Sequence, residues 1–127
     1  MVRGGDRGND LATRTKRFAL RVIRLTGALP KTITAQTLGK QLLRSGTSVG
    51  AQYRESLRSR SDAEFASKLQ GALQELEETC YWLELLAESS LVAASRLEDL
   101  QREASELLAI FIASVKTVKR SRKPEKE

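Results

Sequence analysis

Four arginines recur at three- or four-residue spacing near the start of the chain, at Arg14, Arg17, Arg21 and Arg24. On a helix this spacing places four guanidinium groups along one edge, and no acid lies between Thr13 and Arg24. Because the planar guanidinium suits phosphate oxygens, this arginine stripe predicts binding to nucleic acid. An ordinary solvated helix face is the alternative, although such faces usually mix both charges. Further basic residues complete the predicted nucleic-acid-binding set: Lys40, Arg54, Arg58, Lys119 and Arg120.

Catalytic chemistry finds little support in the residue types. The chain has no histidine, which excludes imidazole acid–base catalysis, Ser-His-Asp triads and the Glu-x-x-His sites of di-iron bundles. Its one cysteine, Cys80, is most simply a small buried hydrophobe in a reducing compartment. The glutamates around Glu75 and Glu78 have no nitrogen ligand beside them, which favours a solvated or salt-bridged face over a metal site. We therefore expect no enzyme, no metal and no cofactor.

Aromatic residues are too few for a platform on which bases stack, since they make up 5% of the chain. Tyr81 and Trp82 are interpreted as core or subunit-contact residues. Single-stranded base recognition is therefore disfavoured, and structured RNA or duplex bound through shape and phosphates fits better.

The net charge of +6 conceals unlike segments. Residues 1–60 carry 13 Lys and Arg against three acids, whereas residues 61–106 carry three basic residues against 11 acids, and residues 107–127 are basic again. This asymmetry predicts one basic surface and one acidic surface. The N-terminus lacks the apolar core of a signal peptide and no apolar run approaches 18 residues, so we expect a soluble, cytoplasmic protein that binds no membrane.

Four amphipathic segments position these residues. Apolar residues at three- and four-residue spacing predict a first helix over about 10–28 and a fourth over about 97–118. Thr32 or Thr34 can cap the second helix, and the capping-box pattern from Ser61 to Glu64 starts the third.

The predicted fold is therefore all-α, an antiparallel up-down four-helix bundle over residues 10–119. A flexible leader at 1–9 is expected before the bundle, and a charged, disordered tail at 120–127 after it.

The predicted second helix carries a seam of small and polar residues that lowers its helix propensity, with Gly39, Gly46 and Gly50 among them. Close approach of another helix explains this seam, and a polar contact with another subunit is a compatible second explanation. Arg44 is expected to pair with Glu75 or Glu78, within the subunit or across the interface. The predicted structural or interface residues beside it are Gln41, Ser45, Ser48, Gln52 and Glu55, which recur at alternating four- and three-residue spacing.

The run QLLRSGTSVGAQYRES at residues 41–56 resembles the signature of the 23S rRNA intervening-sequence proteins, a family of four-helix bundles. The run FASKLQGALQELEETCYWLELL is similar to the third helix of that family. Two departures stand out, because Gln52 replaces the usual Asn and Ser56 replaces Gly or Ala. The resemblance implies a ring-like homopentamer, often with a basic surface. It also implies an architecture like that of the accessory variability proteins of diversity-generating retroelements, which bind a reverse transcriptase and its template RNA.

The functional prediction is a homo-oligomeric, non-catalytic accessory protein that binds RNA or another nucleic acid through its basic surface. The alternative is a protein-interaction scaffold, such as an adaptor for a reverse transcriptase or another acidic partner. The two differ in whether the arginine stripe stays exposed in the assembly.

Overall fold

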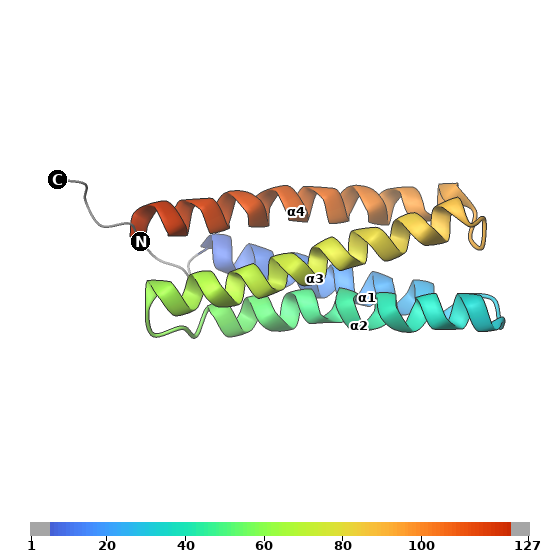
Figure 1. Cartoon of the computed structure of the whole chain (residues 1–127), viewed down its shortest axis with the longest axis horizontal. Coiled ribbons are helices and arrows are strands. Elements are labelled where there is room, and N and C mark those ends of the chain that lie inside the picture. Colours follow the sequence, from blue (N-terminus) through green and yellow to red (C-terminus); the bar gives the residue numbers. More distant parts are fainter. Residues whose placement is uncertain (1–5, 123–127) are drawn as a thin grey trace.

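The computed structural model describes residues 6–122, with side chains from Asp10 to Arg120, and this part of the chain forms helices without any strand. The helices are α1 (Asp6–Gly27), α2 (Ile33–Ser56), α3 (Asp62–Glu88) and α4 (Ala94–Arg122), joined by five-residue connections. Figure 1 shows them side by side, with successive helices running in opposite directions and α1 lying behind α3. The predicted all-α four-helix bundle is confirmed.

Contacts between neighbouring helices follow the antiparallel order. On α2 and α3, Ser45 lies against Thr79, and Glu55, farther along α2, pairs with Lys68, earlier on α3. The helices pack as a ring, α1 on α2, α2 on α3 and α3 on α4, while α4 closes on α1 through the smallest of the four contacts. The backbones of the diagonal pair α1 and α3 do not approach each other as closely as those of neighbouring helices do.

The core is the apolar stripe that the helical period predicts. Phe18 and Val22 of α1 and Phe111 of α4 are fully buried, and the rings of Tyr53 and Phe111 lie 5.7 Å apart between centroids. On α3 the buried apolar residues include Phe65, Leu69, Ala72, Leu76 and Leu83. Cys80, expected to be a small buried hydrophobe, is only half-buried, and its neighbour Thr79 is buried instead.

Side chains define the starts of α2 and α3. The hydroxyl of Thr32 accepts a hydrogen bond from the backbone N–H of Ala35 at 3.1 Å, and that of Ser61 accepts one from Glu64 at 3.1 Å. These bonds satisfy backbone donors that a helix end leaves free. The capping box is changed in one respect, because the Glu64 carboxylate accepts the N–H of Arg60 rather than that of Ser61.

Both outer boundaries of the bundle lie beyond the sequence-based ones. α1 begins at Asp6, so residues 6–9 belong to the helix rather than to the leader predicted for 1–9. α4 continues to Arg122, into the segment predicted as a tail at 120–127. Residues 1–5 and 123–127 lie outside the described residues.

The glycines of α2 allow α1 and α2 to approach closely. A Cβ at Gly46 would lie 2.9 Å from Val22, and one at Gly50 would lie 3.0 Å from the Thr15 hydroxyl. Both glycines are buried. This confirms close helix approach as an explanation of the small seam, since packing gained at the contact offsets the helix propensity lost.

Candidate nucleic-acid interface

The basic surface predicted from the sequence would draw on a segment that contains no acid. Residues 11–54, which make up most of α1 and α2, carry nine Lys and Arg and no Asp or Glu. Because α1 and α2 pack on each other, this segment folds into one antiparallel hairpin, while the acids at 62–106 lie on α3 and α4. The length of the acid-free run is a sequence signal stronger than the gap around the arginine stripe alone. We call the layer formed by α1 and α2 the basic layer, because residues 11–54 supply it with cations and no acid.

Arg14, the first member of the arginine stripe, is occupied within the bundle. Its Nη2 and Nε donate to the two oxygens of Glu103 at 2.7 and 3.1 Å, and Nη2 also reaches Glu106 at 3.2 Å. The hydrogen bond with Glu103 raises the pKa of Arg14 above its ordinary value, and burial opposes the change. The Arg14 side chain is 25% exposed. Its guanidinium thus joins α1 to α4, and the two glutamates compete with the phosphate contact predicted for it.

The rest of the stripe carries no ion pair with the described part of the chain. Arg17 and Arg24 are exposed and Arg21 is half-buried. Arg21 follows Arg14 by seven residues, so the helical period places it on the same α4-facing edge of α1. Arg17 and Arg24 are also seven residues apart, and their α-carbons are separated by about 10 Å along the axis. These three guanidinium groups are available to an external anion.

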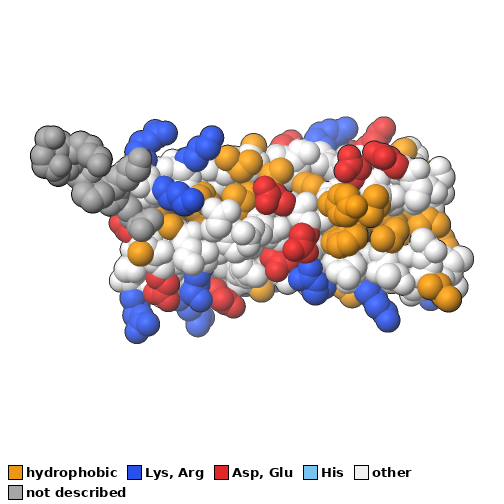
Figure 2. Space-filling model, in the orientation of Figure 1, with side chains coloured by type: hydrophobic (Ala, Val, Ile, Leu, Met, Phe, Trp, Pro, Cys, Tyr) orange, Lys and Arg blue, Asp and Glu red, His pale blue; other side chains and the backbone are white. Residues whose placement is uncertain are grey.

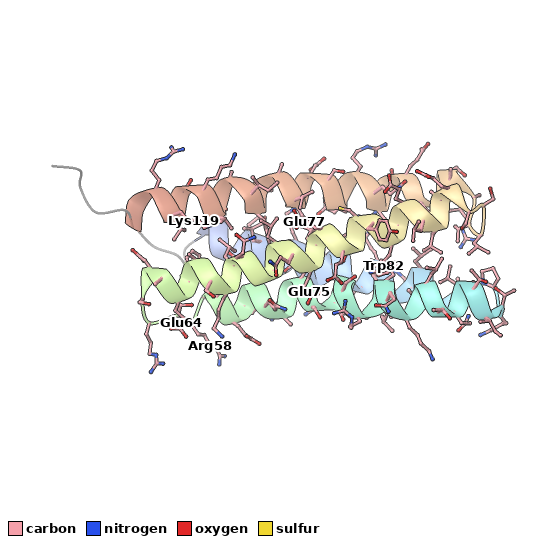
Figure 3. The ribbon with its side chains drawn as sticks, in the orientation of Figure 1. Arg58, Glu64, Glu75, Glu77, Trp82 and Lys119 are labelled. Atoms are coloured by element: carbon pink, nitrogen blue, oxygen red, sulfur yellow. The ribbon has the colours of Figure 1, made fainter. Side chains whose placement is uncertain are left out.

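The other predicted nucleic-acid contacts are exposed but do not form one patch with the stripe. Arg54 lies at the junction of α1 and α2, where it donates to the backbone carbonyl of Ala12 at 3.4 Å. Arg58, in the connection after α2, and Lys119 of α4 lie at the same end of the bundle, on the left in Figure 3. The exposed Arg120 follows Lys119 there, whereas the exposed Lys40 lies towards the other end of α2. The structure therefore divides the predicted set between α1 and the two ends of the bundle.

Arg44 pairs with both of the glutamates proposed for it, within one chain. Its Nη1 donates to Glu75 at 3.2 Å and its Nη2 to Glu78. The hydrogen bond that Arg44 donates to Glu78, followed by the charge of Glu75, raises the pKa of Arg44 above its usual value. Of the nine Lys and Arg in residues 11–54, only Arg14 and Arg44 have a carboxylate partner among the described residues.

Most of the other predicted structural residues meet along the seam between α2 and α3. The Thr79 hydroxyl donates to Ser45 at 2.8 Å in the buried interior, and the Gln52 amide donates to Glu75 at 3.3 Å. Glu55 pairs with Lys68 at 3.5 Å. The two remaining residues differ: Ser48 donates to the carbonyl of Arg44 in its own helix, and the exposed Gln41 has no such contact among the described residues.

An acidic hollow of about 340 Å³ opens between α3 and α4 on the other side of the molecule. Its lining includes Glu77, Cys80, Tyr81 and Glu84. Burial, followed by the charges of the two glutamates, raises the pKa of the Cys80 thiol above its usual value. The described residues contain no cluster of three or more side chains that could hold a metal ion. None of the described helices is long and apolar enough to cross a membrane.

Comparisons with known proteins agree with this architecture. Residues 7–113 match the family model of the 23S rRNA-intervening sequence protein. A solved structure of a protein of unknown function, from the S23 ribosomal protein family of Bacteroides thetaiotaomicron, superposes with a TM-score of 0.80. Its sequence is 35% identical, and the match covers 86% of this chain and 97% of that one. Curated proteins give no match, and neither of the two findings indicates a catalytic family. The chain belongs to the family of 23S rRNA-intervening sequence proteins.

Proposed function

We propose that the protein is a non-catalytic, cytoplasmic accessory protein that binds structured RNA through α1 and assembles with copies of itself. The observation that carries the proposal is the acid-free hairpin of residues 11–54, in which seven of nine cations have no carboxylate partner among the described residues. Unpaired cations on a rigid helical layer attract phosphates, because binding releases the counterions that surround a polyanion.

The three arginines of α1 that have no ion pair with the described residues set how steeply RNA affinity should fall with salt. If Arg17, Arg21 and Arg24 each neutralise one phosphate of a duplex, log K falls against log salt with a slope of about −2.7 for each engaged subunit. Affinity then falls about 40-fold between about 50 and 200 mM salt. Arg14 contributes nothing to this slope, because Glu103 and Glu106 already neutralise it.

The test is binding of a labelled RNA hairpin, followed by fluorescence anisotropy across a salt series. A variant with Gln at Arg17, Arg21 and Arg24 is expected to lose the salt-dependent binding. The matched control removes three charges from α3 and α4 instead, through Gln at Lys68, Arg96 and Arg102, and is expected to keep the wild-type slope.

Equal weakening of the two variants would show that net charge alone drives binding and that α1 is no specific interface. A wild-type protein that binds no RNA at low salt would remove the function altogether. Duplex DNA in the same series separates RNA recognition from general duplex binding, because only RNA offers 2′-hydroxyls and A-form geometry.

A protein-interaction scaffold is the second candidate, and exposed aliphatic side chains on α1 and α2 favour it. Leu20, Ile23 and Leu43 are 42%, 46% and 38% exposed within the basic layer. Phosphates gain nothing from aliphatic groups, whereas a protein surface buries them favourably. An acidic partner such as a polymerase would use both features of the layer.

A further inference from the structure

The α3 wall of the hollow between α3 and α4 presents an aromatic ring between two carboxylates. Glu77, Tyr81 and Glu84 follow one another at four and three residues, so the helical period places them on one edge of α3. All three side chains are exposed, Tyr81 by 52%. The α-carbons of the two glutamates are about 10 Å apart along the helix axis. Figure 2 shows hydrophobic side chains gathered over α3 with acidic ones beside them, and Figure 3 shows Glu77 on the edge of α3 that lies towards α4.

The charges of both carboxylates are uncompensated. Neither Glu77 nor Glu84 has an ion pair with the described residues, whereas Glu75 and Glu78 of the same helix are both paired with Arg44. Burial, and then the charges of Glu77 and Glu84, raise the pKa of the thiol that lies in the hollow, so both charges act on its interior. A cation that enters the hollow therefore meets two acids without displacing a cation of the chain itself.

The α4 wall and the floor of the hollow suit a chain-like ligand better than a bare metal ion. α4 contributes Gln101 and Ser105, whose amide and hydroxyl oxygens accept hydrogen bonds from N–H groups. The lining also includes the fully buried Leu83 and Ala104 and the half-buried Cys80. The described residues contain no cluster of three or more side chains that could hold a metal ion. The hollow thus combines acceptors around its rim with an apolar floor.

We propose that this hollow binds a linear polyamine, with one ammonium group at Glu77, another at Glu84 and the methylene chain across the ring of Tyr81. Ammonium groups donate charge-assisted hydrogen bonds to carboxylates, and the face of a tyrosine ring attracts cations and covers methylenes. The volume of about 340 Å³ lies at the lower end of the range for small-molecule sites. The site is built by α3 and α4, so it is separate from the arginines of α1 and goes beyond the RNA binding proposed above.

The test is calorimetric titration of the whole protein with diaminobutane at low salt, without RNA. Glu77→Gln together with Glu84→Gln is expected to weaken binding about tenfold, as the loss of two partly exposed ion pairs implies. Tyr81→Leu keeps an apolar side chain but removes the ring, and is expected to weaken binding about threefold. The matched control, Asp10→Asn together with Glu55→Gln, also removes two exposed carboxylates, but neither lines the hollow. It should keep the wild-type affinity, and circular dichroism checks that every variant folds.

Mg²⁺ separates a shaped site from a diffuse attraction, because it carries the same charge as diaminobutane but has no chain. Equimolar Mg²⁺ should leave most of the diaminobutane bound. In nuclear magnetic resonance spectra, diaminobutane should shift the backbone amide signals of residues 77–84 and 101–105 and leave those of α1 in place.

Four results would overturn the polyamine site. These are no binding at millimolar diaminobutane, equal weakening by the glutamine pair and by its control, displacement by equimolar Mg²⁺, and an unchanged affinity of Tyr81→Leu. RNA is absent from these titrations and the arginines of α1 are intact in every variant. Failure of the polyamine site would therefore leave the proposed RNA binding to its own test.

Discussion

The close contact between α1 and α2 makes Gly46→Ala the most direct test of how the basic layer is built. A new Cβ at position 46 would lie 2.9 and 3.0 Å from the two γ-methyls of Val22 and 3.3 Å from its Cβ. Val22 is fully buried and β-branched, so its χ1 angle is restricted and the side chain has no flexible end that could swing away. The helices must shift or the packing must strain.

Two effects of opposite sign determine how much Gly46→Ala changes the free energy of unfolding. Replacing glycine by alanine inside a helix gains about 1 kcal/mol of helix propensity. Overpacking a dense interior costs about 1–3 kcal/mol, and three contacts with one rigid side chain place this case in the upper half of that range. We therefore expect a net loss of about 1–2 kcal/mol, which lowers the melting temperature of a domain of this size by about 3–8 °C.

Urea unfolding followed by circular dichroism measures the loss, with Gly27→Ala as the matched control. A Cβ at Gly27 would meet nothing within 4 Å, so that variant should be no less stable than the wild type. In a Val22→Ala background, where both γ-methyls are gone, Gly46→Ala should change sign and stabilise the protein. A Gly46→Ala variant as stable as the wild type would refute the reasoning, since it would show that α1 can move away without cost.

Three further predictions concern other parts of the bundle. Arg14→Gln should destabilise the protein by about 0.5–1.5 kcal/mol in urea, as expected for a partly exposed charge-assisted pair, and leave the RNA salt slope unchanged; a reduced slope would show that Arg14 binds phosphate. Thr79→Val should cost about 1–2 kcal/mol because it removes the buried partner of Ser45, and adding Ser45→Ala should cost little more, as a double-mutant cycle by thermal unfolding checks. The raised pKa of Cys80 predicts that at pH 8 the folded thiol reacts with a disulfide reagent more slowly than the urea-unfolded thiol, with the gap closing as pH rises; equal rates at pH 8 would contradict it.

The sequence predicts the frame of the bundle because the frame depends on local periodicity and capping. Phe18 and Val22 stand at core spacing and are fully buried, and Thr32 and Ser61 are of the residue types that cap helices. The polar stripe of α2 also predicts that Arg44 pairs with a glutamate of α3, and the structure adds that both glutamates belong to the same chain.

Residue spacing within α1 cannot predict which of its arginines form ion pairs with another helix. Arg14 and Arg21 are equivalent by helical period, yet Arg14 meets glutamates 89 and 92 residues away in sequence and Arg21 has no such partner among the described residues. That difference depends on the axial register of α4 against α1, which no spacing within α1 encodes. The exposure of Tyr81 has a similar origin, because Thr79, Cys80 and Tyr81 are neighbours and the rotation of α3 decides which of them faces the core.

The ion pairs show how charges on adjacent helices neutralise each other. The α2–α3 seam does this through Arg44. On α1 the ion pairs stop at Arg14, where the contact between α1 and α4 is the smallest of the four between neighbouring helices. The cations farther along α1 therefore have no oppositely charged partner among the described residues, and neither have Glu77 and Glu84 of α3. A bundle with tighter closure between α1 and α4 would bring acids to those arginines and remove the unpaired charge on which the proposed RNA binding depends.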